Sequence, residues 1–556
     1  MRSQKFILNW ILENQLKTNK ALPIEFSQHG FLLEYLQDDA SRIVVRKPVQ
    51  VGVSFSTILK ILYLADTEAL NFIYTLPTAG DAKDFVLSKF DPIIERSLPL
   101  RQKVTKVPLR GKAIYSTQVK RIGESYFFFR SSWSAWRAQS IDADCIVLDE
   151  LDFMKPEIRK MYEERIEGST SGDTIYWIGY PSVPNYGIEE LFESSDQRFW
   201  YIKCPHCERI QTLTWPESIS LQKKTYVCKH CRKDLSDDDR RRGFWKASFP
   251  GRKIHGYSMN KLMAPWISAK RIIKSFNEGD PKHFFNYTLG LPYVDKDSQI
   301  DIKEIEKKSV IDKVQLGELK LETTVCGIDQ GKEFYLTHGY TTSGRLVVTG
   351  VEVIKEFDEL VRRVRVLKPD MTVIDQGPDL HVSKKVQVEL GAAQCYLANL
   401  RSWSLTADKH RFWELKRSKG LVSIERTESL DCMMDGLRNK SILFLKDTQH
   451  LNLMFSHIGN LIPDYQERYG TVRKIWKFIG PDHFGHALNF MLIASNILYP
   501  DALFRQEKVI PVGIVYDESP IYGQGSAWAR QDFEERINQL NYGEGNIVIP
   551  PKKING

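Results

Sequence analysis

The feature that most constrains this chain is a short apolar run that ends in two adjacent carboxylates. Residues 145–148 read Cys-Ile-Val-Leu, and Asp149 and Glu150 follow them directly. A run this short cannot span a membrane, and it predicts a buried central strand whose C-terminal end enters a phosphate site. Asp149 could hold Mg2+, while Glu150, on the other side of the pleat, could orient the water that attacks a γ-phosphate. The run therefore predicts an ATPase, and the alternative is a core strand whose polar end is only solvated.

Length and charge set the frame for this prediction. Single cores stop growing near about 250 to 300 residues, so a chain of 556 residues is expected to hold two main domains and smaller ones. Lys and Arg number 78 against 70 Asp and Glu, and this mildly basic balance of +8 permits a polyanion partner. No apolar run reaches the about 18 residues of a membrane helix, and residues 1–5 do not open a signal peptide. We therefore expect a cytosolic protein with no membrane partner.

A phosphate-binding turn is predicted ahead of the carboxylate strand. Residues 42–46 favour a strand, a turn with Gly52 follows, and a helix is expected from Ser54. Backbone N–H groups at such a helix N-terminus bind phosphate. The usual P-loop lysine is missing because position 53 is Val, but Lys47 could supply its charge from the other side of the loop. The predicted nucleotide contacts are Lys47, Gln50, Gly52, Val53, Ser54 and Asp149, although a strand, turn and helix with one Gly also occur without a nucleotide.

Strands and helices alternate through the first 200 residues in the manner of a parallel sheet. Further strands are expected at residues 71–78, 126–130 and 174–182, with a helix from Asp81 to about Ser97. This alternation is typical of an α/β domain. Ahead of the carboxylate strand, Arg137 lies in a polar stretch, where it could reach a neighbouring nucleotide as an arginine finger or be an ordinary surface arginine.

Two CxxC pairs are the sharpest local signal in the chain. Cys204 and Cys207 form the first pair, Cys228 and Cys231 form the second, and 20 residues separate the pairs. Four thiolates at this spacing predict a tetrahedral Zn2+ site of the zinc-ribbon type. A redox dithiol would need only one pair, and a catalytic zinc would keep an open ligand position. The other four cysteines are scattered, so a disulfide framework is not expected.

The second half of the chain predicts a metal-dependent nuclease. Residues 324–331 and 334–340 favour a hairpin that carries Asp329, and residues 371–377 favour a buried strand that carries Asp375. With an acidic C-terminal helix, these residues predict a ribonuclease-H-like site, in which two hard cations activate water and stabilise the leaving oxygen. Aspartates at strand ends also occur without any metal.

The third element of this site is a helix predicted to begin at Pro481. Asp482 and His486 lie four residues apart, so both side chains could face the same metals from one side of that helix. The alternative is an N-capping Asp and a surface His.

Cations alternate with aromatic rings between the second and third elements of the nuclease site. Residues 403–419 include Trp403, Arg411 and Trp413, and this composition favours contact with DNA phosphates or simply a solvated loop. After Pro500 the apolar periodicity fades, and Pro and Gly residues predict an extended tail.

The ordered set of these motifs resembles the large terminase subunit of tailed bacteriophages, in its lambda-like branch. In that branch the P-loop lysine is displaced toward the strand, as Lys47 would be here. The C-terminal helix of the family brings an acidic residue to the nuclease centre, often at the position of His486, so either Asp482 or His486 could be the ligand. The resemblance spans residues 40–500 and depends on the order of Lys47 and residues 52–54, residues 76–82, Asp149-Glu150-Leu151, Gly179-Tyr180-Pro181, the two CxxC pairs and Tyr287-Thr288-Leu289-Gly290.

The resemblance implies an ATP-driven motor that translocates viral double-stranded DNA into the procapsid and an endonuclease that cuts concatemeric DNA. It implies ATP, Mg2+ or Mn2+, and Zn2+ as cofactors. The implied partners are the small terminase subunit, the portal protein of the procapsid and further copies of the chain in a ring, in the host cytoplasm and transiently on the procapsid. Alternatives are a DNA-repair or restriction-type ATPase-nuclease and a zinc-ribbon DNA-binding protein without catalysis. In the terminase scheme the catalytic residues are Glu150, Arg137, Asp329, Asp375 and Asp482 or His486.

The expected fold is α/β, with a P-loop ATPase-type parallel sheet, a small zinc ribbon and a C-terminal ribonuclease-H-like nuclease domain. The expected parts in chain order are an N-terminal helical segment (1–40), the ATPase domain (41–200), a zinc-ribbon insertion (201–245), a linker or subdomain (246–320), the nuclease domain (321–500) and a C-terminal tail (501–556).

Overall fold

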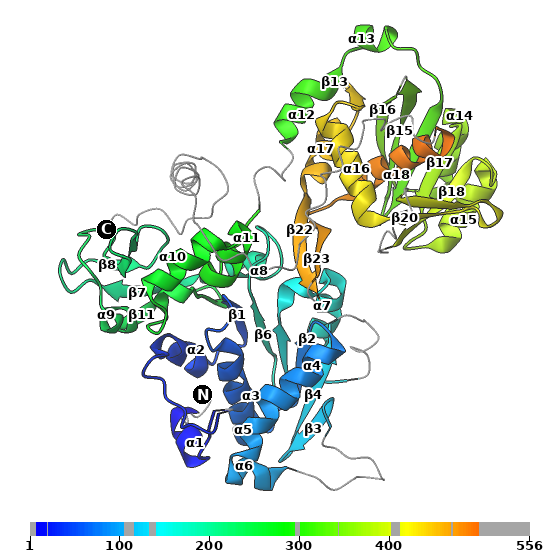
Figure 1. The fold of residues 1–556 in the computed structure, drawn as a ribbon. Coiled ribbons are helices and arrows are strands. Elements are labelled where there is room, and N and C mark those ends of the chain that lie inside the picture. Colours follow the sequence, from blue (N-terminus) through cyan, green and yellow to red (C-terminus); the bar gives the residue numbers. More distant parts are fainter. Residues whose placement is uncertain are drawn as a thin grey trace, which may run out of the picture. The chain divides into compact units, whose positions relative to one another are not determined.

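Two compact units make up the described part of the chain, and the division lies between Tyr293 and Val294. We call them unit 1 and unit 2 (Figure 1). None of the described helices has the length and apolar composition that crossing a membrane requires. The structure is a computed structural model that describes residues 7–18, 20–104, 116–132, 141–294, 301–342, 344–401, 412–468 and 471–499.

Unit 1 contains a ten-stranded sheet in the order β11-β7-β12-β1-β6-β5-β2-β4-β3, with β8 paired to β7. From β7 to β4 in this order, neighbouring strands run parallel. The strands β3, β8 and β11 pair antiparallel with their neighbours. This sheet confirms the predicted α/β class. The strands are β1 (Arg42–Arg46), β2 (Phe72–Leu76), β3 (Val119–Ile122), β4 (Ser125–Ser131), β5 (Cys145–Asp149), β6 (Thr174–Gly179), β7 (Arg198–Lys203), β8 (Ile210–Thr212), β11 (Gly243–Ala247) and β12 (His255–Ser258).

The central strands of unit 1 are buried on both faces of the sheet. Every residue of β2, β5 and β6 is buried, as expected of parallel strands that helices cover from both sides. The helix expected from Asp81 is broken by a π-helical turn at Val86–Phe90. The helices of this part are α1 (Ile7–Glu13), α2 (Leu33–Gln37), α3 (Val53–Glu68), α4 (Ala79–Phe85), α5 (Asp91–Glu95), α6 (Leu98–Lys103), α7 (Pro156–Glu163) and α8 (Ile188–Ser194).

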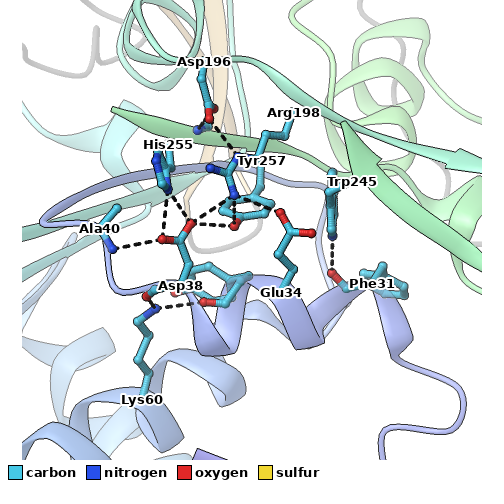
Figure 2. Close-up of polar contacts among 12 residues, drawn as sticks. Phe31, Glu34, Asp38, Ala40, Lys60, Asp196, Arg198, Trp245, His255 and Tyr257 are labelled. Carbon is cyan, nitrogen blue, oxygen red and sulfur yellow. Dashed lines mark hydrogen bonds and ion pairs between the residues drawn. The ribbon is translucent and has the colours of Figure 1, made fainter. Parts of the chain in front are cut away.

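A polar network holds the N-terminal segment to the sheet (Figure 2). Asp38, the residue after α2, accepts a hydrogen bond of 2.6 Å from the Tyr257 hydroxyl and pairs with Nδ1 of His255 at 2.8 Å. Arg198 pairs with Glu34 at 2.9 Å and with Asp38 at 3.3 Å. His255 and Tyr257 belong to β12 and Arg198 begins β7. The segment before β1 is therefore packed against two strands that come much later in the chain.

The segment expected as a linker at residues 246–320 contributes to unit 1 as far as Tyr293. The strand β12 lies inside the sheet, between β7 and β1. It is four residues long, with the sequence His-Gly-Tyr-Ser, and neither alternation nor an apolar run marks it as a strand. The remaining elements of unit 1 are β9 (Ile219–Ser220), β10 (Thr225–Tyr226), α9 (Asp237–Arg241), α10 (Ala269–Glu278), α11 (Pro281–Phe284) and a π-helical turn at Phe285–Leu289.

Unit 2 contains a nine-stranded sheet in the order β13-β21-β16-β15-β14-β17-β18-β20-β19. The strands β14, β15 and β16 pair antiparallel, and β17 and β18 run parallel to β14. A separate antiparallel pair consists of β22 (Leu461–Arg468) and β23 (Thr471–Phe478). The main strands are β13 (Val310–Ile311), β14 (Thr324–Gln330), β15 (Phe334–Thr342), β16 (Arg345–Ile354), β17 (Met371–Asp375), β18 (Cys395–Arg401), β19 (Trp413–Lys416), β20 (Leu421–Glu425) and β21 (Ile442–Leu445).

The last described helix of unit 2, α18 (His483–Leu498), packs directly on β14. A Cβ atom at Gly327 would lie 2.0 Å from the carbonyl oxygen of Ala487 and 2.3 Å from the amide nitrogen of Met491. Only glycine permits this approach of helix to strand. The other helices of unit 2 are α12 (Ile302–Ser309), α13 (Lys313–Gly317), α14 (Phe357–Leu367), α15 (Leu380–Leu390), α16 (Arg426–Arg438) and α17 (Leu451–Gly459).

Candidate functional site

Lys47 and Glu150 meet at the C-terminal edge of the parallel sheet in unit 1. Lys47 directly follows β1, Glu150 directly follows β5, and the Lys47 Nζ atom lies 3.1 Å from Glu150 Oε1. Burial acts to lower the pKa of Lys47, but the charges of Glu150 and Asp149 outweigh burial and raise that pKa above its ordinary value. The lysine predicted to replace the usual P-loop lysine is therefore a buried cation beside the carboxylate pair.

Asp149 faces the first turn of α3. Its Oδ2 atom accepts hydrogen bonds from the Ser54 hydroxyl at 3.1 Å and from the Tyr74 hydroxyl at 2.7 Å. A serine of the phosphate loop and an aspartate at the end of the neighbouring strand are the residue types that hold Mg2+ in P-loop ATPases. The donor set thus fits Mg2+. Tyr74 is a contact that the sequence did not suggest, because it lies inside a uniformly apolar strand.

The loop between β1 and α3 is held in a conformation that side chains seldom adopt. Gln50 has a φ of 62° and Gly52 a φ of 92°, both in the left-handed region. Strained loop residues of this kind cluster at ligand sites. The helix α3 begins at Val53, one residue before the predicted start, so its free N–H groups open onto the loop.

The second carboxylate oxygen of Glu150 has no hydrogen-bond partner among the described residues. Glu150 adopts a left-handed φ of 57° at the strand end, and its Oε2 atom is buried without a hydrogen bond to any residue that the structure describes. A buried carboxylate oxygen left unpaired is costly, and a ligand or a water molecule in the site would satisfy it. Its position fits the predicted base that orients an attacking water.

Asp152 fixes the turn that follows β6. Its carboxylate accepts the N–H groups of Ser182 at 2.7 Å and Ile188 at 2.8 Å, together with the Ser182 hydroxyl. The turn Gly179–Ser182 is thereby tied to the chain just beyond Glu150. Asp152 lies three residues after Asp149. This closeness to the carboxylate pair was the only indication in the sequence that Asp152 has a role at the site.

A half-exposed aromatic pair lies beside the phosphate loop. A Cβ atom at Gly52 would lie 3.6 Å from the His29 ring, and the rings of His29 and Trp266 have centroids 4.3 Å apart. Trp266 keeps 40% of its surface exposed. This arrangement offers a flat apolar surface next to the phosphate loop, and neither residue was singled out from the sequence.

The four cysteines of the CxxC pairs converge in unit 1. Their sulfur atoms all lie within 4.8 Å of one another, with Cys204 to Cys231 at 3.8 Å and Cys207 to Cys228 at 3.7 Å. Zn–S bonds of about 2.3 Å in a tetrahedron require sulfur atoms about 3.8 Å apart. The geometry therefore fits a closed structural zinc site, and all four predicted ligands are brought together.

Asp329 and Asp375 lie at the ends of adjacent parallel strands in unit 2. Ile328 of β14 stands beside Ile374 of β17, so the two aspartates follow at matching positions. Burial and the charge of Asp329 raise the pKa of Asp375 to about 6. Asp329 lies two residues after Gly327 on β14, so its side chain points to the same face as the glycine, toward α18.

The start of α18 adds one predicted pair and one unexpected residue to this site. Asp482 and His486 form an ion pair of 3.1 Å. Asp482 occupies the N-cap position of α18 without a side-chain capping hydrogen bond, and His486 is buried. Burial acts to raise the pKa of Asp482, but His486 and Arg426 lower it overall. His483, which the sequence did not suggest, pairs with Asp329 through Nδ1 at 2.8 Å, and that hydrogen bond raises the pKa of His483.

The acidic residues of unit 2 are near one another but are not gathered around a single point. In the described part of the chain, the four cysteines are the only set of three or more His, Cys, Asp or Glu residues whose ligand atoms lie within 4.8 Å of one another. Asp329 and Asp482 are each occupied by a histidine instead.

Some predicted residues lie outside the described part of the chain. Arg137, residues 402–411 of the basic aromatic loop and the tail from residue 500 onward are among them.

A comparison with known protein families finds a match within unit 1. Residues 30–248 match the family model of the phage terminase large subunit gpA, ATPase domain, and no curated protein matches the chain.

Three solved structures illustrate the similarity to known folds. The large terminase of a thermophilic bacteriophage is 12% identical with a TM-score of 0.30 and covers 86% of this chain and 99% of its own. The HK97 bacteriophage large terminase is 10% identical with a TM-score of 0.48 and covers 88% and 99%. The nuclease domain of the large terminase subunit gp2 of bacterial virus Sf6 is 11% identical with a TM-score of 0.25 and covers 35% and 94%. The resemblance inferred from the motifs is confirmed for residues 30–248, which are similar to the ATPase domain of the phage terminase large subunit gpA.

Proposed function

We propose that this protein is a large terminase subunit, in which unit 1 hydrolyses ATP to drive viral double-stranded DNA into a procapsid and unit 2 cuts that DNA. The observation that carries the proposal is the meeting of Lys47, Ser54, Asp149 and Glu150 at one sheet edge within a gpA-type ATPase domain. These residue types in this arrangement suit phosphoryl transfer, which depends on positioning and charge stabilisation rather than on covalent chemistry.

Each residue of the nucleotide site has a distinct role in this proposal. The N–H groups at Gly52 to Ser54 and the ammonium of Lys47 would bind the phosphates. Ser54 and Asp149 would hold Mg2+, which neutralises charge on the β- and γ-phosphate oxygens when it is bound. Glu150 would orient the attacking water and accept its proton. Arg137 remains a proposed finger for a neighbouring subunit.

The ion pair between Lys47 and Glu150 has a consequence for the catalytic cycle. A lysine that turns toward a bound phosphate would weaken its 3.1 Å contact with Glu150. ATP would draw Lys47 toward the phosphates and leave Glu150 free to accept a proton. We therefore propose that the site rests with its base occupied and becomes active on nucleotide binding.

We propose that the aromatic pair beside the phosphate loop receives the adenine ring. Bases stack on aromatic side chains with little dependence on their identity. The exposed part of Trp266, next to His29 and Gly52, provides such a surface at the edge of the phosphate site.

We propose that Asp329, Asp375 and Asp482 or His486 form the nuclease centre with two Mg2+ or Mn2+ ions. The raised pKa of Asp375 beside Asp329 supports this, because two neighbouring buried carboxylates are best compensated by cations. The ions would have to displace His483 from Asp329, since the two side chains are paired in the protein alone.

The remaining parts of the proposal follow from the terminase family. The protein would act as a homo-oligomeric ring in the host cytoplasm, with the small terminase subunit and the portal protein as partners. The cysteine cluster would hold Zn2+ as a structural ion that stabilises the fold around β7 to β10. The boundary of the nuclease part is proposed between Tyr293 and Val294 rather than near residue 321.

The test is to measure ATP turnover and Mn2+-dependent plasmid cleavage with the purified full chain. We expect both activities, with Asp149→Asn losing ATP hydrolysis only and Asp329→Asn losing cleavage only. A restriction-type or repair enzyme would need ATP for cleavage and would lose both activities in Asp149→Asn. Absence of both activities in the wild-type protein would favour a zinc-ribbon DNA-binding protein.

A further inference from the structure

The last segment of unit 1 contacts two neighbouring parts of the proposed nucleotide site, the chain after β1 and the turn after β6. We call residues 285–293 the exit segment, because the chain continues from it into unit 2. A Cβ atom at Gly290 would lie 3.0 Å from the ring of Pro48, the residue after Lys47. The side-chain amide of Asn286 donates a hydrogen bond to the turn that follows β6. The inference drawn from these contacts rests on the proposed ATP hydrolysis in unit 1.

The side chain of Asn286 is hydrogen-bonded to that turn. Its side chain is fully buried, and Nδ2 donates hydrogen bonds to the carbonyl oxygens of Pro181 at 2.7 Å, Ser182 at 3.2 Å and Leu291 at 2.8 Å. The backbone N–H of Tyr293 also donates to Ser182 at 3.3 Å. Because Asp152 also binds Ser182 of this turn, two buried side chains hold the turn in place.

Tyr287 adds a contact near Asp149 and Glu150. Its hydroxyl donates a hydrogen bond of 2.9 Å to the Tyr180 hydroxyl, and the two rings are in contact, with centroids 4.5 Å apart and an angle of 34° between their planes. Tyr180 is buried, and burial, Tyr287 and the charge of Glu150 together raise the pKa of Tyr180. Tyr287 also contributes to the electrostatic surroundings of Lys47. The two tyrosine hydroxyls therefore lie within electrostatic range of the Lys47 and Glu150 pair.

The backbone of the exit segment is irregular where these two side chains start. Residues Phe285–Leu289 form a π-helical turn, and Gly290 follows with a φ of 63°. Such turns are rare and occur often at functional sites. The π-helical turn continues directly from α11. A segment that serves only for packing would be expected to continue as a regular α-helix.

We propose that Asn286 and Tyr287 are positioning residues for ATP hydrolysis. They hold the turn after β6 and the Tyr180 ring against the chain around Glu150. In this way they fix the position of Glu150 relative to Lys47. Neither residue belongs to the phosphate loop. The rate of the chemical step therefore depends on the exit segment, while the affinity for ATP does not.

The test compares Tyr287→Phe with the wild-type full chain. This change removes the Tyr287 hydroxyl and keeps the contact between the rings of residues 287 and 180. We expect kcat for ATP hydrolysis to fall roughly three- to ten-fold, the range that loss of one hydrogen bond produces. The KM for ATP and the Kd of a fluorescent ATP analogue should stay unchanged, and so should the Tm. Tyr126→Phe, which removes a hydroxyl on β4, is the matched control and should keep the wild-type kcat.

A second variant keeps the proposal open to refutation if the first effect is small. Asn286→Asp preserves side-chain volume but replaces the donor with a carboxylate that faces three carbonyl oxygens, so kcat should fall further than in Tyr287→Phe. A wild-type kcat in a folded Tyr287→Phe protein would overturn the positioning role and leave ATP hydrolysis itself intact. A parallel loss of ATP affinity and Tm would also overturn it, since general destabilisation would then explain the result. A wild-type chain without ATP hydrolysis would refute the proposed function together with this inference.

Discussion

The proposed nucleotide site of unit 1 and the acidic site of unit 2 both place carboxylates beside compensating cations, but they use different side chains to do so. Both bring buried carboxylates together at the ends of parallel strands. In unit 1 the compensating charge is Lys47, which its acidic neighbours keep charged despite its burial. In unit 2 the carboxylates of Asp329 and Asp482 pair with His483 and His486. A lysine gives a permanent internal cation, whereas histidine pairs can yield to metal ions.

The two sites also differ in how they are assembled. The nucleotide site is built mainly from strand ends and the helix that follows β1, so neighbouring segments of one sheet supply it. The acidic site needs α18, which comes more than a hundred residues after Asp375 and reaches β14 only because Gly327 has no side chain. Changes at a distance from the chemistry should therefore damage the second site more readily than the first.

The largest expected effect separates the two sites at Glu150. Glu150→Gln keeps the shape of the side chain but removes the proton acceptor, so kcat for ATP hydrolysis should fall by about 10²- to 10⁴-fold. Metal-dependent cleavage of plasmid DNA should continue at the wild-type rate. Glu157→Gln, an exposed glutamate on α7, is the control and should change neither activity. Loss of cleavage in Glu150→Gln would mean that the two sites are not independent.

The next effect tests the assembly of the acidic site at Gly327. Gly327→Ala forces a Cβ atom against the backbone of α18, and overpacking of this kind costs about 1 to 3 kcal/mol. We expect thermal unfolding of unit 2 at a lower temperature and loss of DNA cleavage, with ATP hydrolysis retained. The matched control is Gly317→Ala, where the added Cβ atom would meet nothing within 4 Å. Equal stability of the two variants would show that α18 can shift without cost.

A smaller effect is expected at the proposed adenine surface. Trp266→Ala removes a stacking surface, and base stacking on an aromatic side chain is worth about 1 to 3 kcal/mol. The KM for ATP should rise roughly ten-fold while kcat changes little. Phe249→Ala, which removes another exposed aromatic ring of unit 1, serves as the control. An unchanged KM would place the adenine elsewhere.

The smallest effect concerns acid stability of unit 2. Burial acts to raise the pKa of Glu352, but hydrogen bonds from His338 and Arg363 outweigh it and lower the pKa to about 2, from an ordinary value of 4.5. A carboxyl group with a lowered pKa adds stability above its unfolded value, and this stability is lost as pH falls from about 4.5 toward 2.

Denaturant unfolding of Glu352→Gln measures this contribution. The variant should be less stable than wild type by about 1 kcal/mol at pH 7, because the pair is partly exposed and screened. The difference should shrink at pH 3. Glu356→Gln, an exposed glutamate nearby, should show no difference at either pH. A difference that grows in acid would contradict the assigned cause.

Local patterns were sufficient for the parts of this protein that depend on neighbours in the chain. The buried strands β1, β2, β5 and β6, the CxxC pairs, and the spacing of Asp482 and His486 all carry their signal within a few residues. Apolar runs and metal-ligand spacing are properties of the local chain, so the α/β class and the cysteine cluster could be predicted directly.

The tertiary structure alone decided which residues from distant segments complete the sites. Asn286 reaches the turn after β6, His483 reaches Asp329, and Trp266 lies beside the phosphate loop. Single polar or aromatic residues have no periodicity that reveals their partners, and the same is true of the short strand β12. Their partners are set by how sheet and helices pack, since a hydrogen bond or ring contact between segments a hundred residues apart leaves no mark on the residues between them.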